Sequence, residues 1–67
     1  MAYYIYAKQK GSREVMHPVG NGTIELLKIY ARQFPDERVD EAVQKLSEDN
    51  PTFQFEKRKV PINEVIL

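Results

Sequence analysis

The residues that could do chemistry in this chain are few and do not form a catalytic set. His17 is the only histidine, and cysteine is absent. Acid–base or nucleophilic catalysis needs a base, an orienting acid and a nucleophile within reach, and a metal site needs several suitably spaced ligands. The sequence around His17 supplies neither pattern. We therefore expect a non-enzymatic protein with no catalytic residue, metal site, cofactor or small-molecule substrate.

The stretch AYYIYAK at residues 2–8 contains three tyrosines. Aromatic stacking is therefore the one chemistry that the residue types favour. Alternate residues of a strand share a face, so Tyr4, Tyr6 and Lys8 point together, and Arg58 is expected beside them. Aromatic rings flanked by cations stack on the bases of single-stranded nucleic acids. The same tyrosines also suit a half-buried strand with solvated hydroxyls, or a face that another segment or protein covers.

The C-terminal tail, residues 61–67, is the candidate for that cover. Ile62, Val65 and Ile66 are spaced as on one helical turn, and an apolar terminus left free is unusual for a soluble monomer. We expect the tail to dock on the tyrosine face or to lie at a dimer interface. The predicted partner-binding residues are Tyr4, Tyr6, Lys8, Arg58, Ile62, Val65 and Ile66.

Length and charge limit the remaining possibilities. The chain has 67 residues and a formal net charge of zero, which predicts one small domain, residues 1–60, followed by the tail. A neutral chain is not built for bulk electrostatic capture of nucleic acid or membrane. No apolar run approaches membrane-spanning length, and no signal-peptide pattern opens the chain, so we expect a cytoplasmic protein without a membrane partner.

The first half of the chain predicts a hairpin and a helix. Residues 2–9 and 13–19 read as strands joined by a turn at residues 10–12, and Pro18 favours a sheet edge for the second strand because proline lacks an N–H donor. After the breaker at residues 20–22, Thr23 suits an N-cap. Apolar residues at spacings of three and four predict a helix over residues 24–34.

The second half predicts another helix and a third strand. Pro35 interrupts the first helix, and Asp36 is a preferred N-cap for a helix over residues 37–48. Residues 52–60 alternate as a strand, with Phe53 and Phe55 facing the core.

These elements predict a two-layer α+β fold of order ββααβ. The first strand carries the most apolar surface and belongs in the centre of a three-stranded sheet of order 2-1-3, with both helices packed on one face. The pattern leaves open whether the third strand runs parallel or antiparallel to the first.

The function that fits this reading is a protein-interaction or regulatory module acting through an exposed sheet face and the apolar tail. Its expected partner is a protein, including a second copy of the chain. The alternative is a single-stranded nucleic-acid-binding protein that uses Tyr4 and Tyr6 for stacking, with flanking lysine and arginine residues on the phosphates.

Overall fold

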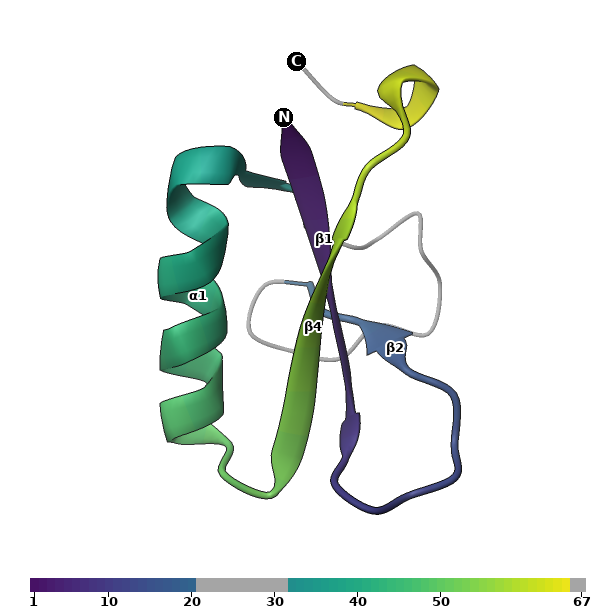
Figure 1. Cartoon of the computed structure of the whole chain (residues 1–67), viewed down its shortest axis with the longest axis vertical. Helices are drawn as coiled ribbons and strands as arrows, with labels where there is room; N and C mark the ends of the chain where they lie inside the picture. The colour runs from purple at the N-terminus through teal and green to yellow at the C-terminus, as the bar shows by residue number, and fades with distance from the viewer. Residues whose placement is uncertain (21–31, 66–67) are drawn as a thin grey trace.

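The described part of the chain has an α+β fold, with an antiparallel sheet and one long helix (Figure 1). The computed structural model describes residues 1–20 and 32–65 of the chain. In chain order the elements are β1 (Ala2–Gln9), β2 (His17–Pro18), β3 (Phe34–Pro35), α1 (Asp36–Asp49), β4 (Phe53–Lys59) and a 3₁₀ turn, η2 (Ile62–Glu64).

Strand β1 lies in the centre of the sheet, as its apolar sequence predicts. It pairs antiparallel with β4 along nearly its whole length, from Tyr3 opposite Lys59 to Gln9 opposite Phe53. Its other edge pairs with β2 near Tyr6 and with β3 near Tyr3, again antiparallel. The two predicted neighbours of the first strand are therefore confirmed, and the orientation that the sequence left open is antiparallel. The predicted three-stranded sheet is wrong, because Phe34 and Pro35 add a fourth strand, β3.

The core lies between the sheet and α1. Ile5 and Val39 are fully buried, and Ala7, Val19 and Phe34 complete the buried cluster. The apolar stripe of α1 and the two phenylalanines of β4 pack around it; these partly buried residues are Ala42, Val43, Leu46, Phe53 and Phe55. The period-2 and helical patterns thus assigned the correct faces of β1, β4 and α1.

The predicted helix over residues 24–34 is wrong at its C-terminal end. Phe34 belongs to β3 and pairs with Tyr3, and its buried ring joins the core. Proline disfavours helical geometry in the residue before it, so Pro35 favours an extended Phe34. Residues 24–31 of that prediction, and the Thr23 cap, lie outside the described residues.

The predicted cap of the second helix is also wrong. The helix itself is present, but the N-cap is Pro35, which makes no side-chain capping bond, and Asp36 is the first helical residue. The backbone N–H of Asp36 instead donates to the carbonyl of Met1, at 3.0 Å. Asp36 and Glu37 still place negative charge in the first turn, where the helix dipole favours it.

Strand β2 is shorter than the predicted strand over residues 13–19. Only His17 and Pro18 form the strand, and Val19 adds a single bond to Ile5, at 2.8 Å. Before them, the backbone N–H of Glu14 donates to the Ser12 hydroxyl. Such local side-chain bonds compete with a ladder, and Pro18 lacks an N–H to extend one.

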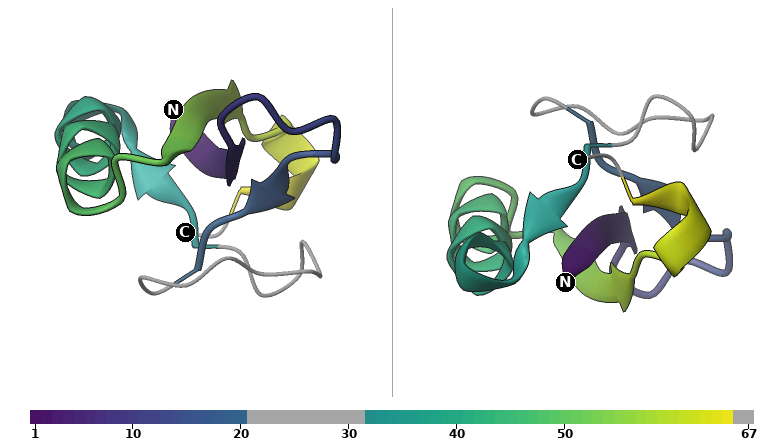
Figure 2. Two further views of the ribbon diagram at one scale, coloured as in Figure 1. Left: turned by 90° about the horizontal axis from the view of Figure 1, so that it is seen from below. Right: turned by 90° about the horizontal axis from the view of Figure 1, so that it is seen from above.

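The far side of the sheet carries the turn η2. Helix α1 and the turn η2 lie on opposite sides of β1 and β4 in both views of Figure 2. The sheet therefore has a helix-covered face and a second face, to which Tyr4 and Tyr6 belong.

Candidate functional site

The Tyr4 side chain is enclosed by residues far away in the sequence. It is 6% exposed, and its hydroxyl donates to Oε1 of Glu64 at 3.1 Å. The Gln33 amide donates to the Tyr4 hydroxyl at 3.3 Å and to the Glu64 carbonyl at 2.7 Å. This polar network ties β1, the approach to β3 and the turn η2 together. Its position leaves the Tyr4 ring inaccessible for stacking on a base.

The Tyr6 ring is covered from the same chain by a cation. The guanidinium carbon of Arg58 lies 4.1 Å from the ring centroid, a cation–π contact. Arg58 also donates to the Glu56 carboxylate on the same strand and lies 3.7 Å from the sulfur of Met16. The Tyr4 and Tyr6 rings meet edge to face at 6.3 Å. The structure thus groups Tyr4, Tyr6 and Arg58, as the sequence predicts.

Lys8 uses its charge locally. Its ammonium group donates to the carbonyl of Ser12 at 3.0 Å, in the connection between β1 and β2. Lys8 therefore starts on the same face of β1 as the two tyrosines, as predicted. Its ammonium group, however, is directed to the turn that contains Ser12.

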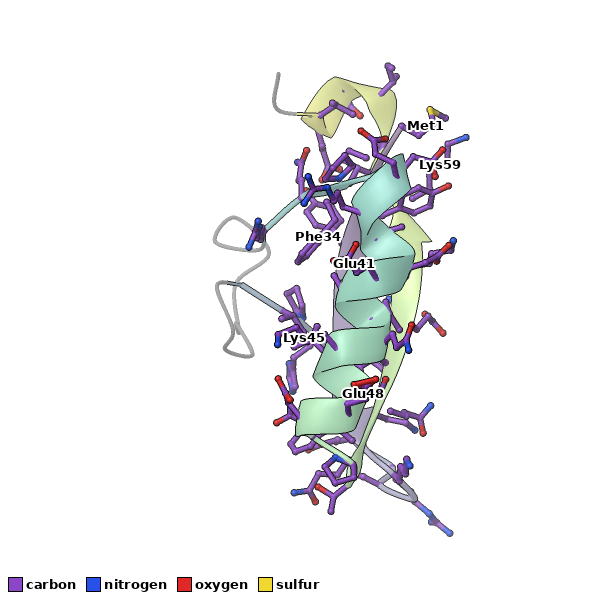
Figure 3. The ribbon with its side chains drawn as sticks, turned by 90° about the vertical axis from the view of Figure 1, so that its left-hand side faces the viewer. Met1, Phe34, Glu41, Lys45, Glu48 and Lys59 are labelled. Atoms are coloured by element: carbon purple, nitrogen blue, oxygen red, sulfur yellow. The ribbon has the colours of Figure 1, made fainter. Side chains whose placement is uncertain are left out.

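The predicted tail residues border a cleft at the end of the sheet. Ile62 is 88% exposed, Val65 is half-buried, and Ile66 lies outside the described residues. The cleft has a volume of about 320 Å³ and is lined by Met1, Ala2, Lys59, Val60, Pro61, Ile62 and Val65. Met1 and Lys59 lie at this same end in Figure 3. We call the six residues of this lining that have uncharged side chains the terminal apolar patch.

Sequence reasoning missed several residues of these sites. Met1 and Val60 belong to the terminal apolar patch, and Gln33 and Glu64 complete the Tyr4 network. Glu64 carried a usable signal, because a single carboxylate inside an apolar segment usually has a specific polar partner. Gln33 carried none, because its contacts lie about thirty residues away in the sequence.

Two adjoining hollows lie along the side of α1. Their volumes are about 600 and 410 Å³, and they share Arg32, Phe34, Ala42 and Lys45. Figure 3 places Phe34 beside this side of the helix. The lining carries both charges, with the carboxylates of Glu37 and Glu41 and the cations of Arg32, Arg38 and Lys45. A mixed lining of this kind selects no single ligand charge.

A salt bridge fastens α1 to β4. The Lys57 ammonium lies 2.9 Å from the Asp40 carboxylate and 5.2 Å from the centroid of the Tyr3 ring. The hydrogen bond to Asp40 raises the pKa of Lys57 above its ordinary value of 10.5. Both side chains are well exposed, so the pair positions the edge of the sheet more than it stabilises the fold.

The described residues were compared with the requirements of two other kinds of site, a metal site and a membrane span. Across residues 1–20 and 32–65, no group of three or more histidine, cysteine, aspartate or glutamate side chains could hold a metal ion. Nor does the described part of the chain contain a helix long and apolar enough to cross a membrane.

No protein-family model matches this sequence, and comparisons with curated proteins and with solved structures find no match either.

Proposed function

We propose that this chain is a non-enzymatic protein-interaction module that self-associates through the terminal apolar patch. The observation that carries the proposal is where its exposed apolar side chains lie. Among the described residues, the exposed large hydrophobic side chains are Met1 at 66%, Val15 at 73% and Ile62 at 88%. Two of the three border one cleft. A clustered apolar surface on a small soluble protein marks an interaction site more often than scattered residues do.

The shape of the terminal apolar patch favours a second copy as its occupant. Ile62 projects into solvent at the rim of a cleft whose lining includes Ala2 and Val60. When one surface carries both a projecting side chain and a cleft, two copies can pair around a two-fold axis. Ile62 of each copy then enters the cleft of the other. Lys59 supplies a polar rim, as protein interfaces commonly have.

The size of the patch sets the expected strength of association. A stable interface buries about 800 Å² on each partner, roughly a sixth of this chain's 5012 Å². The terminal apolar patch covers one end of the sheet and falls below that area. We therefore expect a weak, concentration-dependent dimer.

Sedimentation tests this proposal directly. The wild-type chain is measured from about 10 µM to about 1 mM, a range that covers weak association, beside Ile62→Asp and the matched control Val15→Asp. Because a charge buried without a partner is strongly unfavourable, Ile62→Asp should remain monomeric while wild type and Val15→Asp dimerise. Circular dichroism checks that each variant folds.

Two results would overturn the proposal. The first is a wild-type chain that stays monomeric throughout, and the second is equal loss of the dimer in both aspartate variants. A monomer that binds a single-stranded oligonucleotide, with affinity falling steeply as salt rises, would replace self-association with the nucleic-acid function.

A further inference from the structure

Strand β4 has one open edge in the described part of the chain. It pairs with β1, and no other described strand joins it. The backbone bonds from Val60 to Ala2 and from Lys10 to Thr52 fix which residues face β1. In an antiparallel ladder this direction alternates, so the even-numbered residues of β4 bond to β1. The N–H and C=O groups of Phe55, Lys57 and Lys59 therefore point outward.

The open edge starts at Phe55 and not earlier. The N–H of Phe53 also points away from β1, but it donates to the carbonyl of Asn50 at 3.0 Å. The residues from Phe55 to Lys59 thus form the outer edge of β4, a five-residue stretch whose outward backbone groups bond to no described residue. An exposed edge of this kind accepts another extended chain through main-chain hydrogen bonds.

The last three side chains of this outer edge are cationic. Lys57, Arg58 and Lys59 follow one another, and Lys59 makes no ion pair with any described residue. Lys57 and Arg58 bond to Asp40 and Glu56, respectively, in pairs that are substantially exposed to solvent. Exposed pairs of this kind are weak, so a ligand carboxylate can compete for both cations.

The charges argue against a second β4 as the occupant. Two-fold pairing of antiparallel strands sets residues of the same face opposite each other. A register centred at Lys57 would set that lysine against its own copy, and one centred at Glu56 would oppose two glutamates. A register centred at Phe55 would need the N–H of Phe53, which already donates to Asn50. Like charges directly opposite each other destabilise a sheet.

We infer that the outer edge of β4 binds an extended acidic segment of a partner protein as an added antiparallel strand. Acidic residues of that segment lie opposite Lys59, Arg58 and Lys57, and an apolar residue lies opposite Phe55. Read from its N-terminus, the segment therefore has three acidic residues, one uncharged residue and then one apolar residue. This surface meets the cleft of the terminal apolar patch at Lys59, but its strand-docking groups lie along β4, so the inference does not rest on self-association.

The test uses two peptides and the full chain. The probe is an acetylated peptide, Thr-Glu-Asp-Glu-Thr-Val-Thr, and its control replaces the three acidic residues with Lys-Arg-Lys. The acidic peptide should bind with an affinity that falls as salt rises. It should also slow amide hydrogen exchange at Phe55, Lys57 and Lys59 more than at Glu56 and Arg58, whose amides already bond to β1. The control peptide should do neither.

A pair of variants isolates the backbone contribution. Lys57→Ala removes the charge and keeps the outward N–H, whereas Lys57→Pro removes both. Proline is tolerated where an edge N–H faces away from the sheet, and circular dichroism checks the fold. Lys57→Pro should bind the acidic peptide about three- to tenfold more weakly than Lys57→Ala. Ile62→Ala, which adds no charge beside Lys59, should bind it as wild type does.

The outcomes separate a strand-docking edge from a simple cationic surface. Equal affinity of folded Lys57→Pro and Lys57→Ala would overturn the inference, as would unchanged exchange at the outward amides of wild type. Displacement of the peptide by a single-stranded oligonucleotide, together with equal affinities of the two variants, would assign these cations to nucleic acid instead. If Lys57→Pro does not fold, the exchange measurement on wild type decides the question.

Discussion

At the scale of single residues, Tyr4 and Tyr6 are two identical side chains on one face of β1 with different surroundings. The Tyr4 hydroxyl donates to Glu64 and accepts from Gln33. The Tyr6 ring lies under the Arg58 guanidinium, and its hydroxyl has no hydrogen bond to a described residue. Of the two hydroxyl groups, that of Tyr4 is hydrogen-bonded to described residues. Both rings make contacts, with each other and, for Tyr6, with Arg58.

Removal of each hydroxyl tests this difference. Tyr4→Phe should lower the free energy of unfolding by about 0.5–1.5 kcal/mol, because Glu64 and Gln33 lose a partner in a half-buried site. Tyr6→Phe keeps the ring under Arg58 and should change it by less than about 0.5 kcal/mol. Urea denaturation followed by circular dichroism measures both. Equal losses in the two variants would contradict the assignment of the Tyr4 network.

The side-chain alternation of the sequence predicted which residues face which side. The expected faces of Ile5, Phe53 and Phe55 agree with the structure, because strand geometry follows from local spacing alone. The sequence did not predict that the Tyr4 hydroxyl would meet Gln33 and Glu64. That contact joins residues 29 and 60 positions apart, and no local pattern encodes such a distance.

At the scale of elements, α1 and β4 act as a connected pair. The helix ends at Asp49, and both the backbone and side-chain amides of Asn50 donate to the carbonyl of Leu46. The chain then turns, and β4 runs back along β1. Lys57 of β4 returns to Asp40 of α1 at 2.9 Å, so a single exposed ion pair links the helix to the open edge of the sheet.

This ion pair should be visible in the titration of Lys57. Asp40→Asn should lower the pKa of Lys57, because the hydrogen bond to Asp40 is the main cause of its elevation, while Asp36→Asn should lower it less. A raised pKa stabilises the fold below pH 10.5, and that contribution is lost as the pH rises through the raised value. Heteronuclear NMR of the lysine side chains measures the pKa. An equal decrease in both variants would contradict the assignment.

The elements also show where local pattern was misleading. The spacing of Leu27, Ala31 and Phe34 favours a helix, yet Phe34 pairs with Tyr3 as a strand. Tertiary pairing overrides a local preference of this size, since helix propensities amount to about 0.7 kcal/mol or less for most residues. The helix that begins at Asp36 and the strand at residues 53–59 carried stronger, uninterrupted patterns, and both were predicted.

At the scale of the whole molecule, the sheet is held differently on its two faces. One face is an apolar core against α1, built around Ile5 and Val39. The other carries the hydrogen bonds of Tyr4, Gln33 and Glu64 near η2. A domain of this size has a total stability of about 3–10 kcal/mol. A tail that contributes even 1–2 kcal/mol is therefore a substantial part of the fold.

Two truncations measure what the tail contributes to the whole chain. A chain that ends at Val60 should still fold, because the core lies on the other face, but its free energy of unfolding should fall by about 1–3 kcal/mol as the Glu64 bonds and the burial of Val65 are lost. Tyr4 should also become accessible to nitration. A chain that ends at Val65 keeps these contacts and serves as the control, so it should resemble wild type in both measurements. If the chain that ends at Val60 also matches wild type in both measurements, residues 61–65 do not hold the tyrosine face closed, and the burial of Tyr4 has another cause.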